Sequence, residues 1–396
     1  MEKSYNFKIS VSLNSFFFLL PFGIIIFFKF LESTMFPIIS IWNYIEYLCL
    51  IAIVIKIFLE RSYRVEEVMV SALFLVLGSL NYIKTGDLEI VKLIVIILGA
   101  YKIPVRKILA TYLSISIFLM LVTVISSQIG LVENLIYYNR DTLRISFGFI
   151  YPTNFAAHIF YIYLAVCTYF RYDYKFLKIV LGCLLAFITF KYAGARLDSG
   201  TILLTMIFFT FIDLKLFSSK RILNIFSYSF IVMFVLAYAF SLYYGGGSVL
   251  VKNLDIIFSN RLRLSYEAIT DYGISWWGRT IQFNGLGGTT KTVSNYNYVD
   301  SSYIRLLLLK GWVFTLSFIT YLTIFLKKAV KEKKNIILIV FFLIALNSMI
   351  AQHLLGIAYN VFIITLFADY SDVYTYKSFE GVINEFFSNQ RRKQLY

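Results

Sequence analysis

The residues best suited to chemistry are arginines in the polar parts of an otherwise apolar chain. They are Arg196, the close pair Arg261 and Arg263, and Arg279. A guanidinium group presents a planar fork that can bind phosphate or carboxylate through two parallel hydrogen bonds. These four side chains therefore predict contact with an anionic ligand. The alternative is that arginines in a long loop are simply solvated.

The two histidines are the next candidates. Asn154 and His158 are four residues apart, which places them on one face of a predicted helix. His158 is expected more often to be a satisfied structural residue than a functional one. His353 lies in a short polar stretch between two apolar runs, where a catalytic or ligand-binding role and a structural role are both open.

The other motifs are weaker evidence of a function than the arginines and histidines. The acidic pair of Asp87 and Glu89 has the spacing of a metal-binding pair, but no second acidic cluster supports it. The glycines from Gly285 to Gly288 lack the flanking strand and helix of a phosphate-binding loop and predict a turn. The chain has no GxSxG, HExxH, CxxC or P-loop motif, which argues against a serine hydrolase, a zinc protease and an ATP-driven pump. We expect neither a metal nor a cofactor.

The composition places these residues in a membrane. Of the 396 residues, 59% are hydrophobic and 15% are charged, against about 25% charged residues in a soluble domain. One span needs about 20 mostly apolar residues. The sequence predicts an all-α integral membrane protein, residues 1–396, as a single polytopic domain. About twelve transmembrane helices are expected, at 11–31, 38–59, 66–83, 88–101, 107–128, 153–170, 176–192, 199–216, 222–244, 303–326, 335–351 and 354–370.

Positive charge in the connecting segments predicts the orientation. Segments on alternate sides hold about twenty-two and about six lysines and arginines, and the richer side is expected to be cytoplasmic. Both termini, including the tail 371–396, are then cytoplasmic, and the long polar segment 245–302 between the ninth and tenth spans is a large extracellular loop. The net charge of +15 is thus a topology signal and does not indicate nucleic-acid binding.

Several local features carry a resemblance to a known family. They are the large late loop, the run from Gly285 to Gly287 followed by Tyr298–Tyr303 leading into a span, the Gly-Ala-Arg196 segment, and His353 with Asn360 near the end. In this architecture the chain resembles the Wzy-type polysaccharide repeat-unit polymerases of capsular polysaccharide and O-antigen synthesis, which are related to the O-antigen ligases. The resemblance extends over essentially the whole chain and rests on topology more than on any one motif.

The resemblance implies a membrane glycosyltransferase in the bacterial cytoplasmic membrane. It would polymerise polyprenyl-pyrophosphate-linked oligosaccharide repeat units at the outer leaflet by transferring the growing glycan to a new lipid-linked repeat. The implied partners are this lipid-linked oligosaccharide, membrane lipid, a chain-length regulator and a flippase. Pyrophosphate contact is assigned to Arg196 and Arg261, and the general base to His353. The further substrate-binding candidates are Arg263, Arg279, Glu267, Asp300, Tyr303, Asn154, His158 and Asn360.

Two other functions are open at the level of sequence. An O-antigen-ligase-type transferase would share the donor chemistry and differ in its acceptor. A lipid-linked oligosaccharide flippase or other transporter would place ionisable residues near the midplane of its spans. The loop aromatics, such as Trp276 and Trp277, could stack on sugar rings or lie at the membrane interface.

Overall fold

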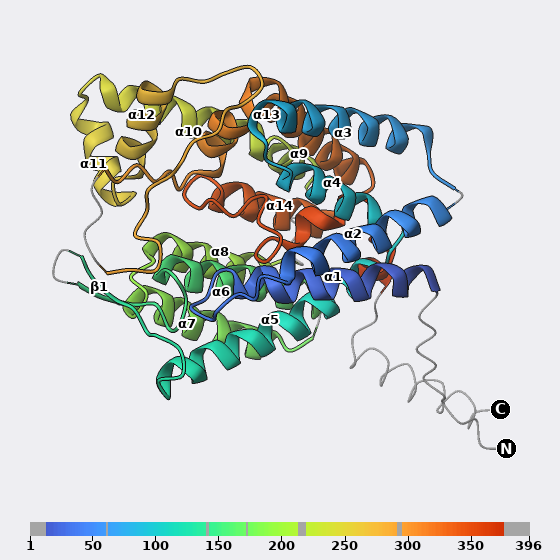
Figure 1. Ribbon diagram of the computed structural model, residues 1–396, viewed down its shortest axis with the longest axis horizontal. Coiled ribbons are helices and arrows are strands. Elements are labelled where there is room, and N and C mark those ends of the chain that lie inside the picture. Colours follow the sequence, from blue (N-terminus) through green and yellow to red (C-terminus); the bar gives the residue numbers. More distant parts are fainter. Residues whose placement is uncertain are drawn as a thin grey trace.

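The computed structural model describes residues 13–60, 62–139, 142–171, 173–212, 219–290 and 295–375, which form a bundle of helices and one small hairpin (Figure 1). The α-helices are α1 Leu13–Leu31, α2 Trp42–Leu59, α3 Val65–Thr85, α4 Glu89–Gly99, α5 Val105–Gln128, α6 Pro152–Tyr169, α7 Lys175–Lys191, α8 Arg196–Thr210, α9 Lys220–Ser227, α10 Ser229–Gly245, α11 Val249–Ile257, α12 Arg261–Tyr272, α13 Ser302–Lys331, α14 Asn335–Asn347 and α15 Ser371–Thr375. The remaining elements are the antiparallel strands β1 Ile136–Asn139 and β2 Thr142–Ile145 and the 3-10 helix η2 Val361–Phe367.

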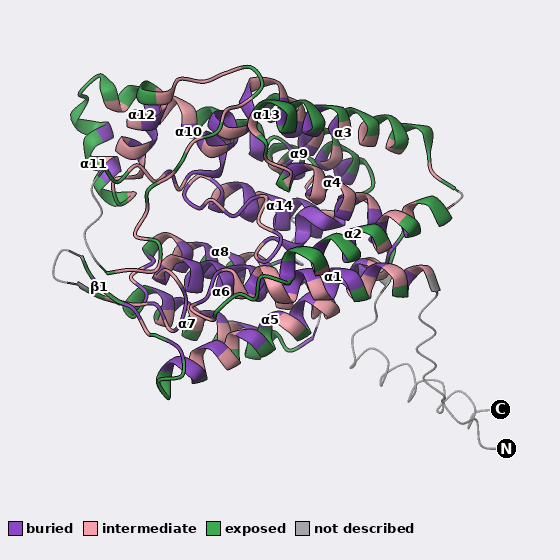
Figure 2. Ribbon diagram, in the orientation of Figure 1, coloured by how far each residue is buried: buried purple, intermediate pink, exposed green. Residues whose placement is uncertain are grey.

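Five of the described helices, α1, α2, α3, α5 and α13, are long and apolar enough to cross a membrane. A sixth span results if α9 and α10, which meet at a bend of 48°, are counted as one. The outer surfaces of these helices carry large exposed apolar side chains, including Phe58 at 83% and Ile83 at 73%. Figure 2 shows this exposed surface along α2 and α3, with α14 buried in the centre. A helix that is apolar on all sides is expected in such a buried position.

Several expected spans are shorter than predicted. The regions predicted as spans at 88–101, 199–216 and 335–351 form helices of 11, 15 and 13 residues. The expected span 354–370 is not an α-helix. It consists of a turn followed by η2. The irregular backbone before η2 has internal partners: Asn360 donates to the carbonyl of Leu354 at 2.8 Å, and the Leu354 amide donates to Ser302 at 3.2 Å. Non-helical backbone at membrane depth requires such burial within protein.

The polar segment 245–302 connects α10 to α13 and has secondary structure of its own. It contains α11 and α12, followed by an irregular stretch from Gly273 to Ser301. These two helices lie at the same end of the bundle as the β1–β2 hairpin (Figure 1). Of the predicted tail, only α15 belongs to the part of the chain that the structure describes.

The irregular stretch is anchored in a break in the longest helix. Gly311 within α13 has φ 80° and ψ 175°, which interrupts the helix. The amide of Trp312 donates to the carbonyl of Ser275 at 3.1 Å, and the amide of Val313 donates to that of Trp276 at 3.2 Å. Backbone groups freed by the break are therefore paired with the incoming loop, as buried polar groups must be.

Candidate functional site

Three arginines from three separate elements converge at the end of the bundle that carries the hairpin. Arg144 lies on β2 opposite Tyr137, Arg261 is the first residue of α12, and Arg305 lies in the first turn of α13. Burial lowers the pKa of the Arg144 guanidinium, and the positive charge of Arg261 lowers it further. We call Arg144, Arg261 and Arg305 the arginine group.

Two of these arginines are held through one nitrogen. The Nε of Arg261 contacts Oδ2 of Asp300 at 3.0 Å, and the Nε of Arg144 donates to the carbonyl of Ala193 at 2.9 Å. Arg144 lies across Gly194, where a Cβ atom would come within 2.9 Å of its side chain. Among the described residues, the terminal nitrogens of both guanidinium groups have no hydrogen-bond partner, so they remain available to a ligand.

Arg305 is held by aromatic rings. Its guanidinium carbon lies 4.5 Å from the centre of the Phe283 ring and 5.4 Å from that of Tyr298. Cation–π contacts of this kind fix the plane of the fork, and one of its nitrogens, NH1, also donates to the carbonyl of Val299 at 3.5 Å. The Tyr298 hydroxyl in turn accepts a hydrogen bond from Gln352. The loop before α13 and the connection after α14 thus position the same arginine.

The acidic residues near the arginine group do not cancel its charge. Asp300 pairs with Arg261, and buried Asp198 accepts a hydrogen bond from Asn347 at 3.0 Å. The two carboxylates of Asp198 and Asp300 therefore lie near three guanidinium groups. The excess of positive charge favours an anionic ligand at this position.

The two histidines lie together although they are almost 200 residues apart in sequence. The ring of Tyr359 stacks between them, with centroid distances of 4.0 Å to His158 and 3.9 Å to His353. His158 is fully buried and its Nε2 lies 2.8 Å from the hydroxyl of Ser33. Burial, followed by the charges of Arg305 and Arg261, lowers the pKa of His353 to about 3. At neutral pH the imidazole of His353 is therefore uncharged.

The other predicted site residues lie elsewhere or have structural partners. Arg196 is exposed at the start of α8 and has no ion pair among the described residues. Arg263 pairs with Glu267 at 2.9 Å, both more than 40% exposed. Arg279 donates to the Tyr272 carbonyl, Tyr303 to that of Ala345 at 2.9 Å and Asn360 to that of Leu354. Asn154 is buried in α6 near His158.

The sequence did not single out Arg144, Arg305, Asp198 or Tyr359 as site residues. Arg144 and Arg305 carried a signal, since both are cations on the side where the charge rule predicts few. Tyr359 was noted only beside Asn360, near the end of the chain. Asp198 carried no signal, because its role depends on neighbours that are distant in sequence.

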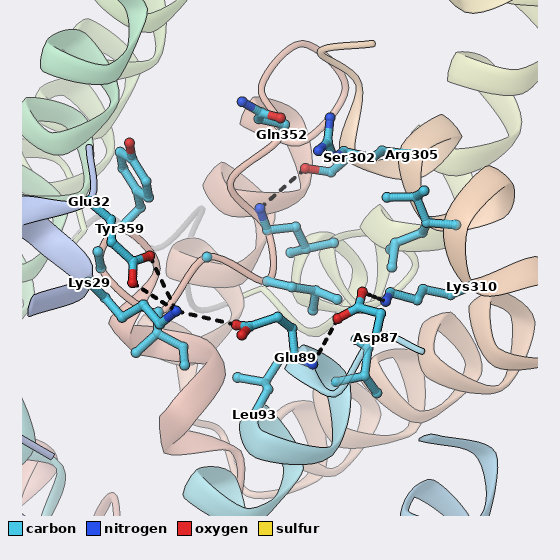
Figure 3. A pocket seen from close by; sticks show the side chains of 18 residues that line it. Lys29, Glu32, Asp87, Glu89, Leu93, Ser302, Arg305, Lys310, Gln352 and Tyr359 are labelled. Atoms are coloured by element: carbon cyan, nitrogen blue, oxygen red, sulfur yellow. Dashed lines mark hydrogen bonds and ion pairs between the residues drawn. The ribbon is translucent and has the colours of Figure 1, made fainter. Parts of the chain in front are cut away.

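A cavity of about 300 Å³ adjoins Arg305. Figure 3 shows its side chains converging from the end of α1, the start of α4, the start of α13 and the connection after α14. Arg305, Gln352 and Tyr359 line this cavity and also contact or approach the residues described above. The arginine group and the cavity are therefore two parts of one polar region.

No protein-family model matches the chain, and searches of curated proteins and of solved structures likewise find no match.

Proposed function

We propose that this protein polymerises polyprenyl-pyrophosphate-linked oligosaccharide repeat units into a capsular or O-antigen-type polysaccharide at the outer leaflet of the bacterial cytoplasmic membrane. The observation that carries the proposal is the arginine group, which gathers three guanidinium groups against two carboxylates at one end of an apolar helical bundle. An amphiphilic substrate with a lipid tail and a pyrophosphate headgroup matches this combination of surfaces.

In the proposed reaction a hydroxyl oxygen of the incoming lipid-linked repeat attacks the anomeric carbon of the growing glycan. A new carbon–oxygen bond forms, and the bond between that carbon and the pyrophosphate oxygen breaks. The carrier pyrophosphate leaves with the electron pair, and the hydroxyl proton passes to a base. Because pyrophosphate is already a good leaving group, the step requires no nucleotide.

The arginine group would stabilise the negative charge that develops on the leaving pyrophosphate. The terminal nitrogens of Arg144 and Arg261 are suited to this task because their Nε atoms already have partners. His353 is the candidate base because its imidazole is uncharged at neutral pH. The charges of Arg261 and Arg305 make it a weak base in the free protein, and a bound pyrophosphate would offset them and raise its pKa. Tyr359 would fix the plane of its ring by stacking.

The experiment compares Arg144→Ala and Arg261→Ala with the control Lys84→Ala in cells from which the native gene has been deleted. Lys84 is an exposed cation at the end of α3 and lies outside the arginine group. Removing one group that stabilises developing charge typically lowers a rate about 10²–10³-fold. We expect both arginine variants to insert normally, to lose long polysaccharide and to accumulate single lipid-linked repeats, whereas Lys84→Ala behaves as wild type.

Arg196→Ala, measured in parallel, tests whether the exposed arginine chosen from sequence takes part. Wild-type chain lengths in both Arg144→Ala and Arg261→Ala would refute the assignment of the arginine group. A deletion strain with unchanged surface polysaccharide and no accumulated lipid-linked intermediates would refute the proposed function itself.

A further inference from the structure

The cavity beside Arg305 differs chemically from the arginine group. Its wall combines a charged rim with an apolar strip from the connection after α14. The charged members are Lys29, Glu32, Asp87, Glu89, Arg305 and Lys310. The apolar members of the strip run from Leu354 to Ala358. Its volume of about 300 Å³ lies at the lower end of the range for small-molecule sites, about 300–1,000 Å³.

The cavity has no excess of positive charge, unlike the arginine group. With Arg305 counted in the arginine group, two lysines face three carboxylates, and both are paired: Lys29 with Glu32 at 3.1 Å and with Glu89 at 3.5 Å, and Lys310 with Asp87. A second anionic group is therefore not favoured here. A purely apolar ligand would remove water from these ion pairs without replacing the hydrogen bonds of their partly exposed oxygen atoms.

The carboxylates are nevertheless open to a ligand. The side chains of Glu32, Asp87 and Glu89 are 35%, 40% and 54% exposed, although each is paired with a lysine. Figure 3 shows Asp87 and Glu89 below Gln352 and Arg305, with Glu32 at the left side beside Lys29. Carboxylate oxygens accept hydrogen bonds from hydroxyl groups, and lysine, arginine and glutamine donate to them. The arrangement suits a ligand with many hydroxyl groups around one apolar face.

We infer that this cavity binds an uncharged sugar residue of the lipid-linked glycan. The inference rests on the proposed function, because it places the sugar beside a pyrophosphate held by the arginine group. Arg305 belongs to both sites and joins them. The ring of the sugar would pack on the strip from Leu354 to Ala358, and its hydroxyl groups would bond to Glu32 and Glu89. Asp87 and Glu89, whose spacing in the sequence is that of a metal-binding pair, are each engaged by a lysine in the structure.

The test measures binding of two probes to the purified full-length protein in lipid nanodiscs. One probe is polyprenyl pyrophosphate without sugar, and the other is the lipid-linked repeat extracted from cells that lack the gene. The variants are Glu89→Gln and Glu32→Gln, which keep the size of the side chain and remove its charge. Glu133→Gln is the control, because Glu133 is an exposed carboxylate that does not line the cavity.

Wild-type protein is expected to bind the repeat-bearing lipid more tightly than the bare carrier. Losing hydrogen bonds to a charged group should reduce this preference about tenfold in each cavity variant, with little change for the bare carrier. Glu133→Gln should retain the full preference. Melting temperatures of all variants establish that each one is folded.

Each result bears on a different claim. Failure of the wild-type protein to bind either probe overturns the proposed function. Binding of both probes with equal affinity, or a full preference in both cavity variants, overturns the sugar site and leaves the proposed function standing. Should one cavity variant not fold, the other still decides between these outcomes.

Discussion

Gly311 offers a sharp test of how the loop is fixed to the helical bundle. A Cβ atom at this position would lie 2.4 Å from the amide nitrogen of Gly278 and 2.5 Å from the carbonyl oxygen of Trp276. Both are backbone atoms, so neither can move without displacing the loop. The conformation at φ 80° and ψ 175° is essentially restricted to glycine and costs another residue about 1–3 kcal/mol.

Gly311→Ala should therefore expel the loop from the break in α13. The variant would lose the two hydrogen bonds from Trp312 and Val313 to the loop, each contributing about 0.5–1.5 kcal/mol. Together with the backbone term, this predicts a loss of about 2–6 kcal/mol in the free energy of unfolding. Activity should fall as well, because the displaced loop joins α12, and hence Arg261, to α13.

The assay is unfolding of the purified protein in detergent by heat or denaturant, with Gly200→Ala as the matched control. Gly200 lies inside α8, and a Cβ atom there would meet nothing within 4 Å. Alanine favours a helix over glycine by about 0.5–1 kcal/mol, so this control should be slightly stabilised. If Gly311→Ala is as stable as wild type or gains stability like Gly200→Ala, the helix is not broken at this residue and the reasoning fails.

Two other predictions follow from buried contacts. His353 is expected to make the free energy of unfolding depend on pH. Its pKa is about 3 in the folded protein and about 6.5 in the unfolded chain. Its contribution to stability is therefore complete above pH 6.5 and falls by about 1.4 kcal/mol per pH unit as the pH falls towards 3. Denaturant unfolding between pH 4 and 8 checks this, and an unchanged slope in His353→Gln would contradict it. Tyr303→Phe should lower the free energy of unfolding by about 1–3 kcal/mol, because the tyrosine hydroxyl donates a hydrogen bond to a carbonyl in the last turn of α14. A midpoint of chemical denaturation equal to that of the wild type would contradict this role.

The long helices could be predicted from the sequence because each is specified by its own apolar residues. The expected spans 38–59, 66–83 and 107–128 correspond to α2, α3 and α5 within four residues at either end. The break at Gly311 could not be predicted, because glycine is common in membrane helices and the loop that enters the break comes from 35 residues earlier in the chain. The expected count of about twelve spans exceeds the five or six helices that meet the length and composition criteria.

The site was predictable only in part, for a similar reason. Arg261, Asp300 and His353 were chosen from sequence, and the structure places them in one region together with His158. Arg196 was chosen from sequence and Arg144 was not. In the fold, Gly194 is important because it has no side chain. This leaves room for Arg144, which reaches across Gly194 from the hairpin. Such a contact depends on tertiary structure alone.

The position of charge along the candidate spans favours a transferase over a transporter. In α1, α2, α3 and α5 every lysine, arginine, aspartate and glutamate lies within the first or last five residues of the helix. The exception among the long helices is Lys310 in α13, which stands at the break and is paired with Asp87 from the start of α4. A transporter needs charged or polar groups along a path through the membrane. Here the charge lies at the ends of these helices, where a lipid-linked headgroup could react without crossing.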